Sequence, residues 1–234
     1  MYEAVRARPD GDATVARLAD AAGGVGYGGV VVCNHSDAKA DYDADAIAEA
    51  TGVDVVEGIT VRAGGPEQAS GAIGNYRGKR TIVAVDGGTN ALNRFAVEQE
   101  RVDVLANPMA GSGDVNHVLA KAARENGVRI EFDLAPVLRS TGGQRVQAIQ
   151  ELRKLREIVT QYDAPYVVSA GPRSHLQLRA PRELRAVGEV IGFDSEAIEA
   201  GLREWGELAE RNRTIQSETF IEPGVEQGRY DDAG

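Results

Sequence analysis

Histidine and carboxylate side chains are the groups in this sequence that could hold a catalytic metal ion. The three histidines, His35, His117 and His175, lie far apart in the chain, and the sequence has no HxH, HExxH or CxxC spacing. Asp86 and Asp133 follow apolar runs, but no imidazole stands at ligand spacing from them. We therefore expect no metal site in the chain. A free-standing metal-dependent hydrolase that uses some of these residues stays open as the alternative.

Phosphate binding is a second chemistry that the sequence could support. In the predicted helix 114–125, His117, Lys121 and Arg124 fall at positions i, i+4 and i+7 and form one stripe beside an apolar stripe. Because like charges at this spacing repel each other, a bound polyanion would relieve a small local cost. A solvated helix face without any partner is the alternative.

Arginines gather again in the segment 169–188. Arg173, Arg179, Arg182 and Arg185 lie in and just after a predicted loop, and Pro181 suits the first turn of the next helix. Backbone N–H groups at a helix N-terminus, together with guanidinium groups, form a phosphate-binding surface. This segment therefore predicts contact with an anion.

The elements that position these residues follow from short apolar runs, each followed by a turn and a helical pattern. The predicted strands are 29–33, 53–61, 81–85, 102–106, 128–132 and 166–169, with a possible first strand at 2–7. The predicted helices are 12–22, 43–51, 89–99, 114–125, 143–162, 181–190 and 195–212. Strands that are apolar on both faces and alternate with helices indicate a buried parallel sheet. We expect an α/β fold, a TIM-barrel-like (β/α) barrel, with an open doubly wound sheet as the second choice.

Local signals refine this outline. Asp114 is expected to cap the helix that follows it, and Asn126 with Gly127 to end that helix in a left-handed turn. We expect one barrel domain over 1–218. The segment 219–234 contains Pro, Gly and acidic residues and predicts an acidic disordered tail.

The charge is unevenly distributed along the 234 residues. The chain has a net charge of −10, yet residues 139–185 contain 9 basic and 4 acidic residues. The acidic excess lies mainly in 1–60 and 186–234. Much acid with 22 Arg and only 4 Lys is typical of proteins from salt-loving archaea, where concentrated salt screens the self-repulsion. A GC-rich genome is the alternative explanation, but it accounts for the arginines alone.

The compartment is indicated by what the sequence lacks. The longest unbroken apolar run covers 30–33, far too short to span a membrane, and the first residues show no signal peptide. The single cysteine, Cys33, excludes a disulfide framework. We expect a cytoplasmic protein without a membrane partner.

Several segments of the sequence resemble a known family. The segments 113–121 (GDVNHVLAK) and 126–138 (NGVRIEFDLAPVL) are similar to the archaeal ribonuclease P protein component 3 family, and so are 167–170, 179–184 (RAPREL) and 190–192. The close similarity covers 102–192, and the order and spacing of its segments are fairly specific. The many acidic residues and few lysines depart from the family pattern.

The resemblance implies a subunit of an RNA-based endonuclease that removes the 5′ leader from precursor tRNA. The catalytic groups, with Mg²⁺, would belong to the ribonuclease P RNA, and this chain would bind no cofactor. Its partners would be that RNA, precursor tRNA, a small second protein subunit and other holoenzyme proteins. Basic positions carried over from the family as RNA contacts are Arg94, His117, Lys121, Lys154, Arg179 and Arg182. A barrel that only scaffolds other proteins is a third hypothesis.

Overall fold

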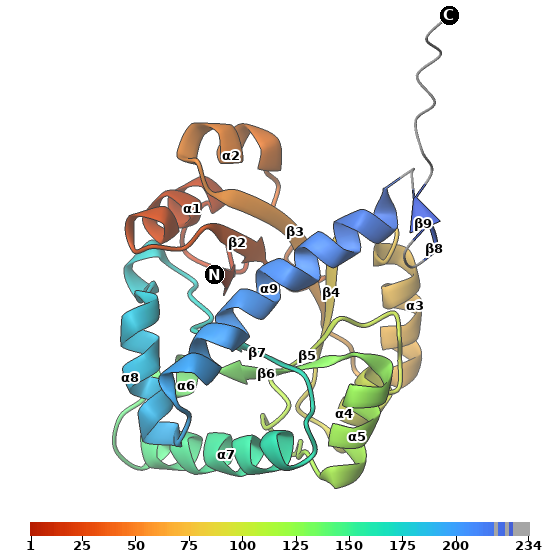
Figure 1. Cartoon of the computed structure of the whole chain (residues 1–234), viewed down its shortest axis with the longest axis vertical. Coiled ribbons are helices and arrows are strands. Elements are labelled where there is room, and N and C mark those ends of the chain that lie inside the picture. Colours follow the sequence, from red (N-terminus) through yellow and green to blue (C-terminus); the bar gives the residue numbers. More distant parts are fainter. Residues whose placement is uncertain (218–219, 223–224, 227–234) are drawn as a thin grey trace, which may run out of the picture.

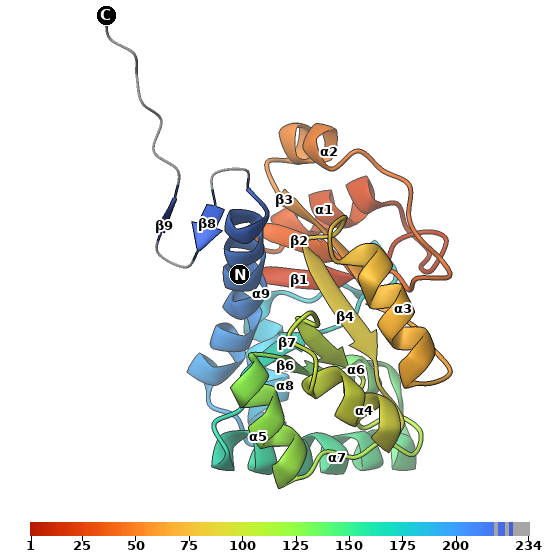
Figure 2. The ribbon, with the colours of Figure 1, turned by 90° about the vertical axis from the view of Figure 1, so that its right-hand side faces the viewer.

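Seven parallel strands form the centre of the molecule. The computed structural model describes residues 1–217, 220–222 and 225–226. Each strand is hydrogen-bonded to the next one in sequence, and the sheet curves into a nearly closed barrel with helices around it (Figure 1 and Figure 2). The strands are β1 Tyr2–Val5, β2 Gly29–Val32, β3 Asp54–Val61, β4 Ile82–Asp86, β5 Val104–Ala106, β6 Arg129–Asp133 and β7 Tyr166–Ser169. Because the strand order never reverses, the predicted TIM-barrel-like fold is confirmed and the doubly wound sheet is excluded.

Nine helices and a 3₁₀ turn lie within the described part of the chain. They are α1 Val15–Gly24, α2 Ala44–Thr51, α3 Pro66–Tyr76, α4 Asn90–Val97, α5 His117–Asn126, α6 Ala135–Arg139, α7 Gly142–Gln161, η1 His175–Gln177, α8 Pro181–Ile191 and α9 Ser195–Gln216. The sequence did not predict α3 or α6. Helix α3 buries only Ala69 and Ile73 and contains Gly71 and Gly74, so its helical pattern is weak. Helix α6 is only five residues long.

The start of α5 differs from the prediction. Its N-cap is Asn116, whose Oδ1 accepts hydrogen bonds from the N–H groups of Val118 and Leu119. Asp114, the predicted cap, lies before the helix, and both of its carboxylate oxygens accept hydrogen bonds from Lys154 of α7. A distant lysine thus binds the carboxylate, and the nearer asparagine caps the helix. The predicted left-handed turn at Gly127 is confirmed, with φ at 65°.

Helix α9 closes the amino end of the barrel. It runs diagonally across the strands (Figure 1) and sends Trp205 into the barrel interior, where the indole Nε1 donates to the Val168 carbonyl at 3.0 Å. Near its end, the Asn212 side chain donates to the carbonyl of Thr81 and to Asp103, which directly precede β4 and β5. The opposite, carboxyl end of the barrel is formed by loops, and these loops carry polar side chains.

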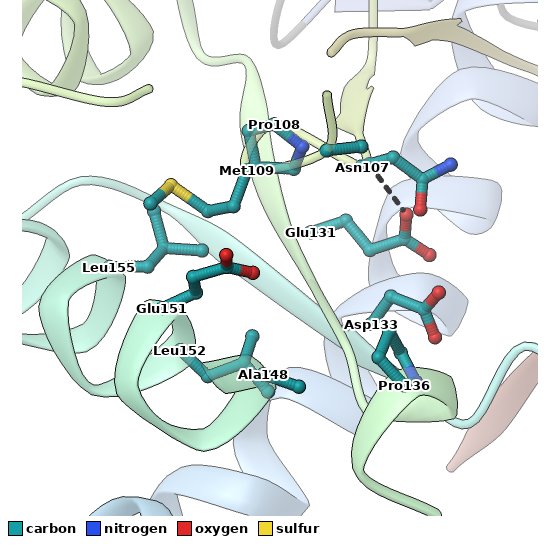
Figure 3. Close-up of a pocket in the computed structure, with 11 residues that line it drawn as sticks. Asn107, Pro108, Met109, Glu131, Asp133, Pro136, Ala148, Glu151, Leu152 and Leu155 are labelled. Atoms are coloured by element: carbon teal, nitrogen blue, oxygen red, sulfur yellow. Dashed lines mark hydrogen bonds between the residues drawn. The ribbon is translucent and has the colours of Figure 1, made fainter. Parts of the chain in front are cut away.

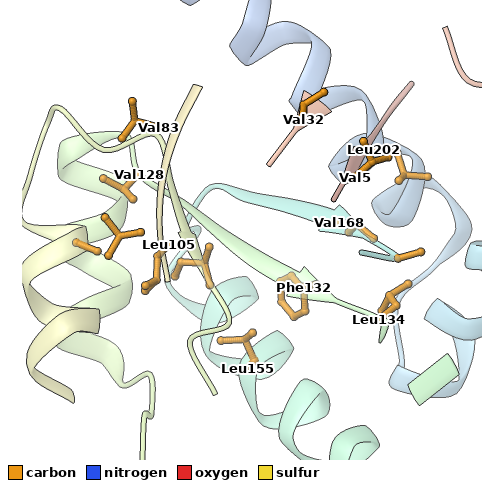
Figure 4. Packing of buried hydrophobic residues seen from close by; sticks show 14 of the residues in the cluster. Val5, Val32, Val83, Leu105, Val128, Phe132, Leu134, Leu155, Val168 and Leu202 are labelled. Carbon is orange, nitrogen blue, oxygen red and sulfur yellow. The ribbon is translucent and has the colours of Figure 1, made fainter. Parts of the chain in front are cut away.

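The larger apolar core lies between the strands and the surrounding helices. Val5, Val32, Val83 and Val168 point outward from their strands into this layer (Figure 4). Phe132 completes it with edge-to-face contacts to neighbouring aromatic rings, at centroid distances of 5.5 and 5.0 Å. Residues that alternate with these ones point into the barrel, so both faces of the sheet are buried, as the apolar runs predicted.

The predicted tail falls largely outside the described residues. Residues 218–219, 223–224 and 227–234 are not described. In the remainder, Phe220–Glu222 (β8) and Val225–Glu226 (β9) pair as antiparallel strands, and the division into a barrel and a tail stays a prediction. None of the described helices is both long enough and apolar enough to cross a membrane.

Candidate nucleic-acid interface

Four of the predicted RNA contacts lie on α4, α5 and α7, and we call them the α4–α7 group: Arg94, His117, Lys121 and Lys154. The Arg94 side chain is 71% exposed and pairs with Glu98 one turn later at 2.8 Å. Lys154 lies across from it in an ion pair with Asp114 at 2.8 Å. Arg94, Asp114 and Asn116 line an open recess between α4 and α5. Both ion pairs are solvent-exposed and weak, so a phosphate can replace the carboxylates.

His117 and Lys121 share an aromatic neighbour that the sequence analysis missed. Tyr162 follows the last residue of α7, and its ring centroid lies 6.0 Å from that of His117. The Lys121 ammonium lies 5.4 Å from the same ring. The stripe predicted on α5 is therefore packed against α7 at this point. Nothing in the local sequence around Tyr162 places it beside residues some forty positions earlier.

The other two predicted contacts lie in the α8 loop, which we define as residues 170–183. Arg182 is exposed in the first turn of α8, and within the described residues its side chain has neither a hydrogen bond nor an ion pair. The half-buried Arg179 donates through Nη1 to the carbonyls of Leu176 and Leu178, at 3.2 and 2.8 Å. Pro181 occupies the first turn of α8, as predicted. Both guanidinium groups are thus free of carboxylate partners in the described structure.

A buried chain of hydrogen bonds holds the α8 loop in place. The Tyr27 hydroxyl lies 3.0 Å from Glu3 Oε2 and 3.1 Å from the Arg179 carbonyl. Glu3 Oε1 accepts the Ala170 N–H at 2.9 Å. Burial raises the pKa of Glu3 to about 8, so this carboxyl group is mostly protonated at neutral pH. A protonated Glu3 donates to Tyr27, whose one hydroxyl proton is then available for the Arg179 carbonyl.

The sequence contained a signal for Glu3. A charged residue within an apolar strand is rarely buried without a partner, and Glu3 is fully buried in β1. Its partner Tyr27 lies in a glycine-rich turn, where no pattern distinguishes it.

The α4–α7 group and the α8 loop are not brought together. Helices α4 and α5 lie on one side of the barrel and α8 on another, with α7 running between them (Figure 1). Helix α7 belongs to the basic segment 139–185, and its Arg153 donates to the Val190 carbonyl of α8. The two groups are therefore separated by α7.

The three histidines of the metal-site alternative are also dispersed. His35 lies at the barrel mouth with Nδ1 2.7 Å from Asp10 and Nε2 3.6 Å from Asp86, while His117 and His175 lie on α5 and η1. Among the described residues, no group of three or more His, Cys, Asp or Glu side chains is placed to hold a metal ion. The donor set therefore does not fit a metal centre.

A pocket beside β6 is lined by carboxyl groups and is unsuited to binding phosphate. Glu131 and Asp133 from β6 and Glu151 from α7 line it, with Met109 and Leu155 among its apolar walls (Figure 3). Burial and the neighbouring Asp133 raise the pKa of Glu131 to about 7. An anion entering this pocket of about 90 Å³ would meet negative charge and no cation.

Comparisons with known proteins agree with this geometry. A ribonuclease P protein component 3 from Haloarcula marismortui is 63% identical over 96% of this chain and 96% of its own length. One chain of a cryo-EM structure of archaeal ribonuclease P with mature tRNA matches with a TM-score of 0.83, covers 99% of both chains and is 22% identical. A histidinol phosphate phosphatase from Lactococcus lactis, solved with zinc, L-histidinol and phosphate, has a TM-score of 0.50 and 9% identity over 82% of this chain and 94% of its own. At such identities the two structures show the fold alone.

The family itself is shown by a model that spans most of the chain. The model described as RNase P subunit p30 matches residues 1–217. The resemblance noted in the sequence is thereby confirmed, as is the prediction of a ribonuclease P subunit over that of a free-standing hydrolase. The relatives also fit the predicted halophilic character. The chain belongs to the RNase P subunit p30 family.

Proposed function

We propose that this chain binds and supports the RNA of ribonuclease P, which supplies the catalytic groups for removing the 5′ leader of precursor tRNA. The observation that carries the proposal is the pair Arg179 and Arg182, two guanidinium groups without carboxylate partners in the described structure, on a loop anchored through Tyr27. Phosphates need a few well-placed cations on a rigid scaffold, and this loop supplies them.

The salt in which related organisms live makes guanidinium geometry important. In concentrated salt, the entropy gained by releasing counterions from RNA becomes small. Directed hydrogen bonds from planar guanidinium groups must then provide more of the affinity, and arginine suits this better than lysine. The excess of 22 Arg over 4 Lys fits that requirement.

The remaining predicted contacts have a secondary role in this proposal. The α4–α7 group would contact the RNA on the other side of α7: Arg94, His117, Lys121 and Lys154. RNA phosphates would first displace Glu98 from Arg94 and Asp114 from Lys154. A small second protein subunit and further holoenzyme proteins complete the assembly, which we place in the cytoplasm. Mg²⁺ would be held by the RNA, and the chain itself would need no cofactor.

Reconstitution tests the proposal directly. Cleavage of precursor tRNA is measured in concentrated KCl with cognate RNA and the other subunits, with and without this chain. The chain alone should show no cleavage, and it should raise cleavage by the assembly. Absence of stimulation, with a competent set of other subunits, would contradict the proposal. Stoichiometric zinc or manganese in purified protein, with cleavage by the chain alone, would favour the hydrolase.

A paired substitution tests the loop. The double variant Arg179→Ala/Arg182→Ala should weaken RNA binding by roughly tenfold or more, since each charged hydrogen bond contributes about 1.5–3 kcal/mol before screening. Its matched control, Arg17→Ala/Arg211→Ala, removes the same charge from two exposed positions on α1 and α9. If both double variants stimulate equally well, the loop is not the RNA contact and the scaffold hypothesis is preferred.

A further inference from the structure

The alternation of side chains along the strands directs a set of ionisable groups into the carboxyl end of the barrel. In β1, Val5 faces the helices while Ala4 faces inward, so Arg6 also faces inward. In β6, Phe132 faces outward, so Glu131 and Asp133 face inward with Arg6, and all three line one cavity. The cavity that remains beside them measures about 10 Å³, room for one water molecule at most.

Arg6 is the least exposed arginine in this group. Its side chain is 16% exposed, and its Nε lies 3.8 Å from Asp10 and has no hydrogen-bond partner among the described residues. Burial raises the pKa of Glu131 and Asp133, and the charge of Arg6 opposes that rise. Burial also disfavours the charged forms of Asp10 and Asp86, but hydrogen bonds with His35 and, to a smaller extent, the charge of Arg6 hold the pKa of both below its usual value. One guanidinium thus faces carboxylates from three separate parts of the barrel.

The other cations near the mouth are more exposed or occupied elsewhere. Arg62, at 3.7 Å from Asp86, is 47% exposed, and Arg173, at 3.5 Å from Asp10, is 51% exposed. Arg139 donates to the Ala170 carbonyl. Solvent screens the first two charges strongly, so neither can substitute for Arg6.

Two loops meet directly over Arg6. The Arg6 N–H donates to the Pro172 carbonyl at 3.0 Å, and the Asp12 N–H donates to the Arg173 carbonyl at 2.6 Å. The first of these loops is 6–14, between β1 and α1, and the second is the α8 loop. A Cβ placed on Gly11 would meet the backbone oxygens of both Arg6 and Arg173, so the loops are in close contact.

We propose that the Arg6 guanidinium is the built-in counter-cation of the barrel mouth, and that its charge holds the α8 loop against the loop 6–14. A side chain of the protein itself thus supplies positive charge among these carboxyl groups. Arg6 is then a positioning residue for Arg179 and Arg182, a consequence that rests on the proposed function. Its effect on the loop and on stability does not depend on RNA.

The test compares substitutions that remove the charge with one that restores the balance. Arg6→Ala should lower the thermal midpoint by roughly 10 °C, because it leaves buried carboxylates without their cation. Trypsin should cut after Arg173 and Arg179 at least about tenfold faster in that variant, below its unfolding temperature. Arg62→Ala is the matched control, and its midpoint should stay within about 2 °C of the wild type. Arg6→Gln serves in the same comparison if the alanine variant does not fold.

The decisive experiment removes a carboxyl group from the protein that has already lost the Arg6 cation. Asp133→Asn keeps the oxygen that accepts the Ala135 N–H but removes the ionisable carboxyl group. When Asp133→Asn is added to Arg6→Ala, the double variant should recover at least half of the decrease in thermal midpoint and at least half of the lost resistance to trypsin. The single variant Arg6→Lys should keep most of the wild-type midpoint and most of the wild-type resistance. If the double variant is no better than Arg6→Ala, Arg6 acts by packing and the proposal is wrong. Cleavage stimulation by the wild type is measured separately, so failure of the proposed function is recognised independently.

Discussion

The buried carboxyl group of Glu3 provides the sharpest test of how the α8 loop is held. Glu3 is fully buried, with a pKa of about 8 against an ordinary value of 4.5, mainly because of desolvation. The folded protein therefore keeps a proton on this group over a pH range in which the unfolded chain has released it. The stability due to this proton is fully present below pH 4.5 and is lost as the pH rises through 8.

The substitution Glu3→Gln isolates this effect. A glutamine can accept the Ala170 N–H through its amide oxygen and donate to the Tyr27 hydroxyl through its amide nitrogen, so the hydrogen bonds survive. Each pKa unit corresponds to about 1.4 kcal/mol. Between about pH 5.5 and about pH 8, the wild type should therefore lose roughly 3 kcal/mol relative to the variant, and the difference should then level off.

The assay is urea unfolding of both proteins across this pH range in concentrated KCl. Comparing the two proteins at each pH cancels the pH-dependent contributions of the groups that do not interact with Glu3. Glu49→Gln, which makes the same substitution on the exposed side of α2, is the matched control, and its stability should stay within about 0.5 kcal/mol of the wild type. A difference for Glu3→Gln that stays within about 0.5 kcal/mol, or that changes in the opposite direction, would refute a protonated Glu3 in the folded state.

Three further substitutions test other parts of the structure. Trp205→Ala should cost about 3–5 kcal/mol in urea unfolding because it empties the barrel interior, and a loss below about 1 kcal/mol would show that α9 does not close the barrel as described. Tyr27→Phe should cost about 1–3 kcal/mol and speed tryptic cleavage after Arg179, since the hydroxyl bound to that carbonyl is lost; unchanged cleavage would count against this anchor. Lys154→Ala should change stability by less than about 1 kcal/mol, because both partners of its ion pair are about half exposed, whereas a large loss would indicate a structural role.

The order of strands and helices was largely predictable from local pattern. Strands buried on both faces carry nearly continuous apolar runs, and helix ends carry recognisable residues such as Gly127 and Pro181. The pattern failed where a helix makes little apolar contact, as in α3, or is only five residues long, as in α6. It also failed at Asp114, because a capping residue and an ion-pair partner look alike in sequence.

The basic residues of the candidate interface could be predicted from the sequence, but their arrangement on the surface could not. The helical repeat placed His117 and Lys121 on one face of α5, but their contact with Tyr162 depends on how α5 packs on α7. Likewise, the separation of the α4–α7 group from the α8 loop depends on the course of α7.

By itself, the sequence determined the alternating α/β architecture, the uneven charge and the guanidinium-rich loop, because each is a property of neighbouring residues. Only the tertiary structure decided which charges face each other. Barrel closure brings Glu3 into hydrogen-bond contact with Ala170, and it places Arg6 and Asp133 around the same cavity, pairs from opposite halves of the chain. Burial then changes what these groups do, since desolvation keeps a proton on Glu3 and makes one arginine the counter-ion of several carboxylates.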